Sequence, residues 1–395
     1  MPEGDYVKTW REKPGKFYRD SEGNYWEARD IGNGRKFMVP APPWAGYINF
    51  YLFEGPDIIV ERHMKPLCDV PVLRGGSTPR DGGNLILTDE QKKELLRTDP
   101  LAEKFLRPFM MGRDFLYNAP RWCLWMVGAE PADIRNCPHV LERIERVREF
   151  RLKSKREATK KLAETPMLFS EIRYSTTDYL AIPMVSSHKR KYIPIGWLSS
   201  DVIAGNHLFM CANSTLYQFG VLSSSVHNAW LKLISGRFGV SINYSNTLDY
   251  NAFPWPGVLG TRGQGLGTRE QGLGGRELDP KHYDLISQTA QAILDARSLY
   301  PRSSLADLYD ERTMPPELRK AHNANDEAVM AAYEFVRHYE DERLHDEDIA
   351  VNLLYMYKEL SGCEERTRHY PNLELWLKYY PEDAEELGVE LEDED

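Results

Sequence analysis

A Gly-rich duplication past the middle of this 395-residue chain sets the strongest limit on how it can fold. Residues 260–266 read GTRGQGL, and residues 267–273 repeat them as GTREQGL. Such a segment cannot bury enough apolar surface to build a core, and Gly-rich segments behave as flexible linkers. It closely follows a Pro-Trp-Pro run that ends at Pro256. The sequence therefore predicts a linker over residues 257–278, with a differently built domain on each side.

The part before the linker alternates short β-type runs with turn residues. Aromatic and β-branched residues predict strands over residues 47–53, 57–61, 122–127, 179–185, 192–198 and 214–219. Thr88 with Gln91 forms the pattern of a capping box, so a helix is expected to begin there. Apolar residues at helical spacing predict a long helix over residues 138–161, and a short one is expected over 225–234.

The part after the linker is predicted to be helical. Asp279 and Pro280 are typical of a helix start, and Ile286, Ala290 and Ile293 follow on one side. Further helices are expected from Asn325 or Asp326 to 335 and over 346–360. The predicted fold class is α+β: a mixed, β-rich domain with a long helix, followed by an α-helical C-terminal module. The expected divisions are 1–100, 101–256, the linker 257–278, the helical module 279–380 and an acidic tail 381–395.

Charge is distributed unevenly along the chain. The formal net charge is −10, which by itself argues against a nucleic-acid partner. Residues 101–256, however, carry 20 Lys and Arg against 13 Asp and Glu, whereas residues 301–395 carry 10 against 26. Such asymmetry between segments says more about partners than the total does. A basic middle can contact phosphates while an acidic end faces solvent or a protein.

Composition also bears on the compartment. The N-terminus lacks the basic and apolar regions of a signal peptide, and no window is long and apolar enough for a membrane span. The five cysteines are scattered and form no CxxC pair, so zinc is not expected. The prediction is a cytoplasmic protein with no membrane partner.

Residues 236–256 place hydrogen-bonding side chains between aromatic ones. Arg and Asn, which occur here as Arg237 and Asn243, are well suited to reading the edges of guanine and adenine. A short basic loop over residues 186–191 and a basic helix over 143–161 can each contact phosphates, or can simply be solvated. Phe238 is expected in the core, and so is Trp230. Phe253 and Trp255 are expected to close the edge of the domain.

Catalytic motifs are absent from the sequence. A methyltransferase needs a Gly-rich turn after its first strand, and an amino-methyltransferase also needs an Asn-Pro-Pro-aromatic loop; neither occurs. Residues 118–121 (NAPR) are the nearest imitation, and they lack the second proline and the aromatic. No nuclease cluster or Gly-x-Ser-x-Gly elbow is present either. The sequence therefore predicts no catalytic residue, metal site or cofactor site in this chain.

Several segments resemble, in the same order, the MmeI-like family of restriction–modification enzymes. Residues 105–115 and 120–125 resemble the opening of the family's target-recognition domain, and residues 140–151 resemble its connecting helix. Residues 192–196, 215–222 and 253–256 follow in the family's order, and residues 283–332 resemble its C-terminal helical part.

The resemblance implies that the chain reads duplex DNA. Complete members join a nuclease and an adenine-specific methyltransferase to this module, and such enzymes flip the target adenine out of the duplex. Residues 1–100 are then a remnant or connector from the methyltransferase side, and residues 101–256 are the target-recognition domain. S-adenosylmethionine is expected only in a methyltransferase partner or a missing domain. The expected partners are duplex DNA and a methyltransferase or nuclease subunit.

The resemblance also implies which side chains touch DNA. Family base-reading residues fall in segments that match 189–191, 211–214 and 238–243 of this chain. The implied base contacts are Lys191, Asn213, Ser241 and Asn243, with Arg237 either reading a base or bracing its neighbours. The implied phosphate contacts are Arg151, Lys155, Lys189 and Arg190.

Two other readings stay open at this point. The chain can be a truncated adenine-specific DNA methyltransferase, which an open reading frame upstream of Met1 encoding the missing motifs would support. It can also be a protein-interaction scaffold that binds through its helical end without contacting DNA. Whether it is an enzyme is therefore left undecided, with no catalysis expected from this chain alone.

Overall fold

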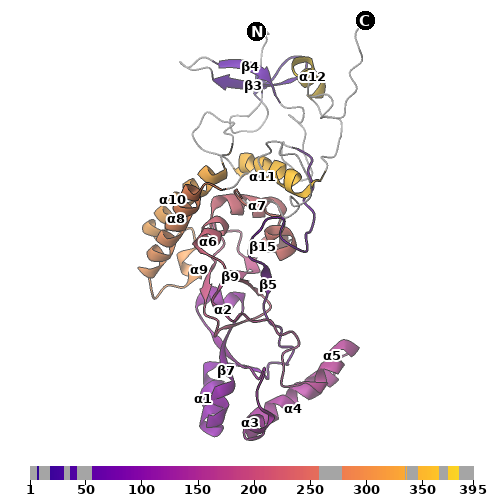
Figure 1. The fold of residues 1–395 in the computed structure, drawn as a ribbon, viewed down its shortest axis with the longest axis vertical. Coiled ribbons are helices and arrows are strands. Elements are labelled where there is room, and N and C mark those ends of the chain that lie inside the picture. The colour runs from indigo at the N-terminus through magenta and orange to yellow at the C-terminus, as the bar shows by residue number, and fades with distance from the viewer. Residues whose placement is uncertain are drawn as a thin grey trace. The chain divides into compact units, whose positions relative to one another are not determined.

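The computed structural model describes residues 7–8, 18–30, 36–41, 56–257, 278–333, 335, 346–363 and 372–381, which fall into two compact units (Figure 1). The first unit comprises residues 1–68, 251–277 and 333–395, and the second comprises residues 69–250 and 278–332. The predicted strand at 47–53, nearly all of the predicted linker and nearly all of the acidic tail lie outside the described residues. The α+β class is confirmed, because each described unit contains both helices and strands.

Within the residues that the structure describes, the first unit contains an antiparallel sheet and two helices. Its strands, in the order β1-β2-β3-β4, are Val7–Lys8, Tyr18–Arg19, Tyr25–Asp30 and Lys36–Pro40, and its helices are α11 (Asp346–Ser361) and α12 (Leu373–Tyr379). The side chain of Asn372, at the start of α12, accepts a hydrogen bond from the backbone N–H of Tyr25 and donates to the carbonyls of Tyr25 and Ala41. This amide therefore joins the sheet to the C-terminal helix. Phe253 and Trp255 are fully buried and pack edge to face in this unit; that they close the edge of the domain over 101–256 stays a prediction.

The second unit contains three sheets. An antiparallel sheet of order β11-β9-β13-β5 joins Gly196–Leu198, Tyr179–Pro183, Leu208–Ala212 and Leu73–Gly75. A sheet of order β12-β7-β8-β6 joins Ile203–Ala204, Leu106–Met110, Arg121–Leu124 and Ile86–Leu87. A small antiparallel sheet of order β10-β15-β14 joins Val185–Ser186, Ser241–Asn243 and Gly236–Phe238. Strand β9 is buried along its whole length and continues almost directly into β10, so the buried sheet positions the small one.

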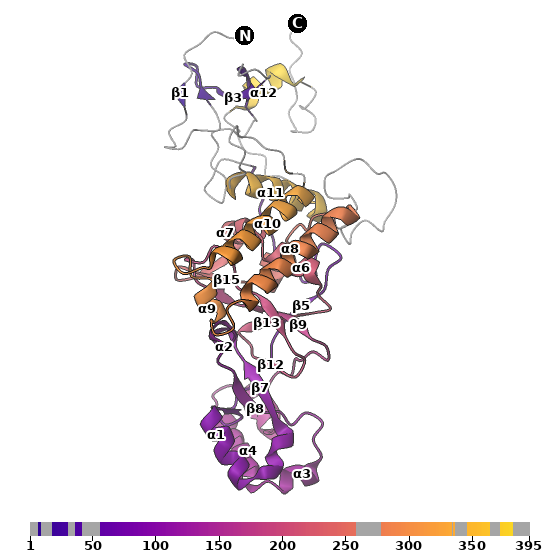
Figure 2. The same cartoon turned by 90° about the vertical axis from the view of Figure 1, so that its left-hand side faces the viewer.

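Residues 79–110 and 121–169 form a lobe at one end of the second unit, to which strand β7 leads in both views (Figures 1 and 2). We call it the α4 lobe. Its helices are α1 (Asp89–Thr98), the 3-10 helix η1 (Pro100–Phe105), α3 (Pro131–Arg135), α4 (Pro138–Leu152), α5 (Glu157–Lys161) and the 3-10 helix η2 (Leu162–Glu164). Val140, Ile144 and Val147 of α4 enter its core at the predicted helical spacing. Asp99 accepts hydrogen bonds from the N–H groups of His139 and Val140, which caps the start of α4.

The remaining helices of the second unit pack beside the two sheets that contain β9 and β15. They are α2 (Gly112–Tyr117), α6 (Leu216–Leu222), α7 (Ser225–Ile234), α8 (Pro280–Ser298), α9 (Leu305–Leu308) and α10 (Pro316–Tyr333). Helix α10 carries two buried polar anchors. Asn325 donates to the carbonyl of Gly220 in α6, and Asp326 accepts from the N–H of Ser225 at the start of α7. These two side chains thus join the C-terminal helices to the part of the chain that precedes the predicted linker.

None of the described helices is long and apolar enough to cross a membrane.

Local patterns located helices better than strands. The capping box at Thr88 and the helix over 225–234 are confirmed. The predicted strand at 214–219 is wrong: Thr215 and Gln218 form another capping box, and the segment is helix α6. The predicted strand at 57–61 is also wrong, because the segment belongs to no sheet. The long helix ends at Leu152, before a break at residues 153–156, and α10 begins at Pro316 rather than near Asn325.

We predict that Gly76→Ala is strongly destabilising. A Cβ atom at this position would lie 2.3 Å from the carbonyl oxygen of Gly205 and 2.5 Å from that of Ala204, and backbone atoms cannot move aside cheaply. Overpacking of this kind costs about 3 kcal/mol of unfolding free energy. Urea denaturation followed by circular dichroism measures it. Gly236→Ala is the matched control, since a Cβ there meets nothing within 4 Å; equal midpoints for the two variants would contradict the prediction.

Candidate nucleic-acid interface

The small sheet β10-β15-β14 has two unlike faces. Cross-strand partners share a face, and side chains alternate along each strand. The register pairs Asn243 with both Val185 and Gly236, and it pairs Phe238 with Ser241. We call this set the outer face. Of its members, Val185, Gly236, Phe238 and Asn243 are exposed, and Ser241 is half-buried.

The opposite face, which we call the inner face, is built around Ile242. Ile242 is paired with Ser186 on one side and Arg237 on the other, and both Ile242 and Ser186 are buried. Arg237 is exposed, and its guanidinium donates to the carbonyl of Lys232 in α7, 3.1 Å away. Two predicted base contacts, Ser241 and Asn243, therefore lie on the outer face, whereas Arg237 lies on the inner face. The bracing alternative for Arg237 fits this geometry better than base reading does.

A buried carboxylate holds the two ends of the β14–β15 hairpin together. Asp249 accepts a hydrogen bond from the hydroxyl of Ser235, just before β14, and one from the N–H of Ser245, just after β15. Burial raises the pKa of Asp249 to about 7, and the two hydrogen bonds oppose this shift. The hairpin is therefore anchored at its base, while its tip, with a tight turn at Gly239 and Val240, faces solvent.

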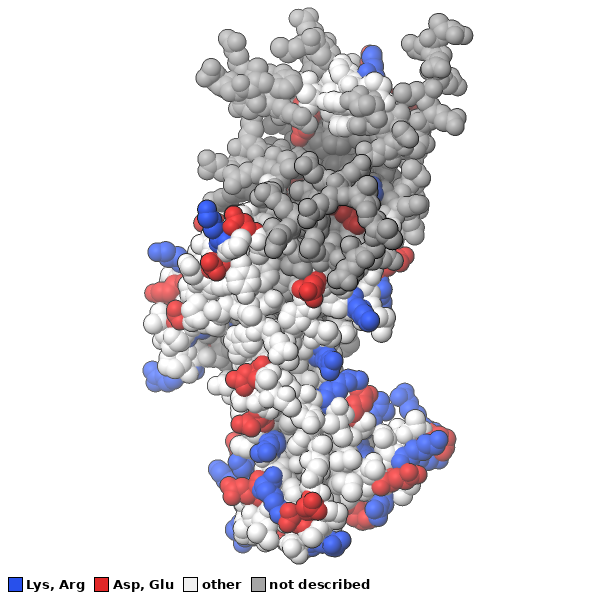
Figure 3. Space-filling view, in the orientation of Figure 1, with Lys and Arg blue, Asp and Glu red and all other residues white. Residues whose placement is uncertain are grey.

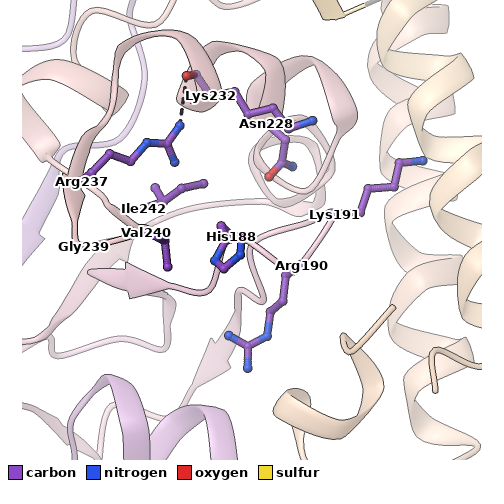
Figure 4. A pocket seen from close by; sticks show the side chains of 9 residues that line it. All are labelled: His188, Arg190, Lys191, Asn228, Lys232, Arg237, Gly239, Val240 and Ile242. Atoms are coloured by element: carbon purple, nitrogen blue, oxygen red, sulfur yellow. Dashed lines mark hydrogen bonds between the residues drawn. The ribbon is translucent and has the colours of Figure 1, made fainter. Parts of the chain in front are cut away.

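A positively charged pocket lies against the inner face. It has a volume of about 320 Å³ and is lined by His188, Arg190, Lys191, Asn228, Lys232, Arg237, Gly239, Val240 and Ile242 (Figure 4). The lining contains four Lys and Arg side chains and no carboxylate. Such a surface is suited to anionic groups such as phosphate oxygens. In Figure 4 the side chains of Arg190 and Lys191 point away from each other, so the pocket's cations face more than one direction.

Lys191 is held by the C-terminal helices. Its ammonium nitrogen lies 3.8 Å from a carboxylate oxygen of Asp326, and its side chain remains 43% exposed. The hydroxyl of Tyr192 donates to the same carboxylate, and burial raises the pKa of Asp326 above its usual range. Helix α10 therefore positions the end of the basic loop. Lys189 and Arg190, the predicted phosphate contacts beside it, are exposed and half-buried, respectively.

Asn213 is not brought together with the other predicted base contacts. It follows β13, whose last residue pairs with Tyr179 at the start of β9, whereas the small sheet adjoins the other end of β9. Five strand residues separate these ends by roughly 13 Å. Asn213 also has a left-handed backbone with φ of 60°, a conformation that Asn adopts more easily than most residues. The left-handed backbone thus gives a conformational reason for an asparagine at this position.

Arg151, a predicted phosphate contact, is fully buried, so that expectation is wrong. Its guanidinium donates five hydrogen bonds of 2.7–3.0 Å to the carbonyls of Pro79, Arg80, Leu162, Thr165 and Leu168. No donor is left for DNA. The side chain instead joins α4 to two loops of the α4 lobe.

The basic helix is less basic than its sequence suggests. Arg146 pairs with Glu142, Arg148 with Glu145, and Lys160 with Glu157. Figure 3 shows Lys and Arg interspersed with Asp and Glu over this lobe. Lys155 lies in the break between α4 and α5 and is exposed, so it stays a candidate phosphate contact.

Phe238 is a surface residue that the sequence analysis placed wrongly. It was expected in the core, but it is 76% exposed, and its neighbour Val240 is 67% exposed. Trp230, expected in the core as well, is buried. One sequence signal could have revealed its exposure: Phe238 and Ser241 are separated by two residues, one of them a glycine, which is typical of a hairpin turn.

Among the described residues, no three His, Cys, Asp or Glu side chains gather as a metal site would require.

Comparison with known proteins identifies the family. The family model of the MmeI target recognition domain matches residues 54–257, and that of the MmeI C-terminal domain matches residues 278–363. The chain belongs to the MmeI family. DNA methyltransferase A of Bacillus subtilis (strain 168) is 32% identical over 314 residues, which cover 80% of this chain and 33% of that protein.

A solved structure of the MmeI family has the same fold. The structure of the Type IIL restriction-modification enzyme MmeI in complex with DNA matches with a TM-score of 0.72 and 36% identity. The match covers 87% of this chain and 42% of that one, so the chain spans well under two thirds of the proteins it matches. The matched target recognition domain includes the whole small sheet and its pocket. The expected domain boundaries at residues 100, 256 and 380 stay predictions.

We predict that Arg151→Lys lowers the unfolding free energy by about 3 kcal/mol. A lysine has only three donors and cannot reach five carbonyls, so buried acceptors lose their partners. Urea denaturation measures the change. Lys155→Ala, four residues away and exposed, is expected to stay within about 0.5 kcal/mol of the parent. A parent-like midpoint for Arg151→Lys would show that the guanidinium is not a structural anchor.

A second prediction concerns pH. Because the pKa of Asp249 is near 7 in the folded protein, the folded chain keeps this proton between about pH 4 and pH 7, while the unfolded chain loses it. The unfolding free energy from this group therefore falls as pH rises through that window and stays level above it. Relative to Asp249→Asn, the parent should lose about 3 kcal/mol between pH 5 and pH 8. Urea titrations at both pH values measure this; a constant difference between the two proteins would refute it.

Proposed function

We propose that this chain is the sequence-specific DNA recognition module of a restriction–modification system, and that the second unit binds the duplex. The observation that carries the proposal is the match of the target recognition domain to a protein solved in complex with DNA, at 36% identity. The exposed polar face of a small sheet beside a cationic pocket supports it independently. The Bacillus subtilis relative, named a DNA methyltransferase, supports the link to methylation.

In this proposal the two faces of the small sheet have different tasks. Ser241 and Asn243 on the outer face form hydrogen bonds to base edges, since a two-stranded ribbon fits the major groove. The inner-face pocket, with Lys232, Arg237 and Arg190, neutralises phosphates and sets the position of the hairpin. Lys191, which pairs with Asp326, contacts DNA between the outer face and the inner-face pocket. Lys189 and Lys155 add exposed cations for the backbone.

In this proposal, methyl transfer is catalysed by another part of the restriction–modification system. We infer a methyltransferase elsewhere, on a partner subunit or a further domain, which binds S-adenosylmethionine and acts on the adenine that this module locates. A cytoplasmic location fits a partner that is genomic or invading DNA. A mobility-shift assay with random duplexes at low salt tests the proposal at its simplest. Absence of any duplex binding, alone or with the methyltransferase, would end it.

We predict different consequences for two substitutions in the binding surface. Asn243→Ala should weaken binding to the preferred duplex 10- to 100-fold and leave binding to random duplexes nearly unchanged, because a base-directed pair of hydrogen bonds is lost. Lys189→Ala should weaken binding to every sequence alike and reduce the slope of log affinity against log salt by about 0.9. Fluorescence anisotropy over a series of salt concentrations measures both. Uniform weakening by Asn243→Ala would remove Asn243 from the base-reading set.

A further inference from the structure

An exposed apolar side chain stands on the surface that is proposed to read DNA. Phe238 is 76% exposed at the end of β14, and Val240, in the adjoining turn, is 67% exposed. Single exposed apolar residues are common on proteins and need no explanation. Phe238 differs from such residues by its place, because it shares the outer face with Asn243 and is paired directly with Ser241.

The hairpin holds Phe238 away from the rest of the protein. Its turn consists of two residues, Gly239 and Val240, with a positive φ only at Gly239, as in a type II′ turn. Nothing lies within 4 Å of a Cβ placed at Gly236 or Gly239, so the space around the tip is open. The base of the hairpin is fixed by Asp249. A large apolar ring is thus presented on a narrow ribbon whose base is anchored.

Basic side chains lie near both edges of the small sheet. Lys232 and Arg237 lie on the inner-face side. At the other edge of the outer face, Val185 lines a second cavity of about 660 Å³, together with Arg113, Arg121 and His207. This cavity also contains Asp114, which pairs with Arg121. Cations near both edges of a sheet that carries an exposed apolar ring complement a polyanion whose groove has apolar groups within it. Duplex DNA is such a partner, because its major groove displays the C5-methyl group of thymine beside hydrogen-bonding edges.

We propose that Phe238 is a specificity-determining residue that contacts the C5-methyl group of a thymine in the major groove. The assignment rests on the proposed DNA-reading function of the outer face and adds an apolar contact to its polar ones. Ser241 and Asn243 satisfy donors and acceptors of base edges, and the ring covers a methyl group next to them. Burying one methyl group against the ring corresponds to about fourfold in affinity.

The test is a selection from a pool of duplexes with a randomised segment, using the full chain with any methyltransferase it needs. Three proteins are compared: the parent, Phe238→Ala, and Leu299→Ala, a control with an apolar side chain of 62% exposure at the end of α8. The parent and the control should select one sequence that contains thymine at a defined position. Phe238→Ala should lose the preference at that position and keep the preferences at the others.

A second measurement changes the DNA instead of the protein, so its result for the parent does not depend on how well a variant folds. Replacing the selected thymine by uracil removes only the methyl group, and it should lower the affinity of the parent about fourfold and that of Phe238→Ala not at all. If Phe238→Ala selects the parent's sequence with unchanged base frequencies, or if uracil is bound by the parent as well as thymine, the assignment of Phe238 fails while DNA reading stands. If the parent selects no sequence, the proposed function itself fails.

Discussion

The burial of Ile242 is the constraint on which the candidate interface depends. A strand places consecutive side chains on opposite faces, so a buried Ile242 requires Ser241 and Asn243 to face outward. A shift of one residue would bury Asn243 and expose Ile242, so the apolar side chain fixes the register. The same alternation places Arg237 on the inner face, although it is only a few residues from Ser241 and Asn243 in the sequence. One apolar contact therefore separates side chains available to bases from those available to phosphates.

Three buried ionisable side chains hold elements of the second unit in place. Asp249 joins the ends of the hairpin, Asp326 joins α10 to α7 and to Tyr192, and Arg151 joins loops of the α4 lobe. An ionisable group is costly to bury, and each of these three is buried together with hydrogen-bond partners. None of the three is free to bind DNA, and their donors and acceptors are used within the protein. The charges that remain for a partner are those at the surface, around the pocket and in the basic loop.

Sequence reasoning predicted local structure well where a side chain acts on its own backbone. Capping residues and apolar spacing located α1, α7 and α8, and the same kind of signal at Thr215 would have located α6 if it had been weighed above aromatic content. Whether a charged residue faces solvent depends on partners distant in the chain. Arg151 finds its carbonyl partners 11–72 residues away, and no periodicity within α4 shows this. Phe238 was misplaced for a related reason, since apolar residues are usually buried and only the tertiary position of the hairpin decides otherwise.

The separation of faces also bears on how a DNA-reading surface can change without loss of the fold. Ser241 and Asn243 contribute side chains to an exposed face, and their strand pairing comes from backbone hydrogen bonds that most residues can form. Exchange of these side chains therefore costs little folding energy, whereas exchange of Ile242 between them removes a buried contact. Gly239 is constrained differently, because its positive φ disfavours any other residue. In the proposed function, the positions that meet bases are thus the ones that the fold leaves free, and the residues that hold them in place alternate with them along a single strand.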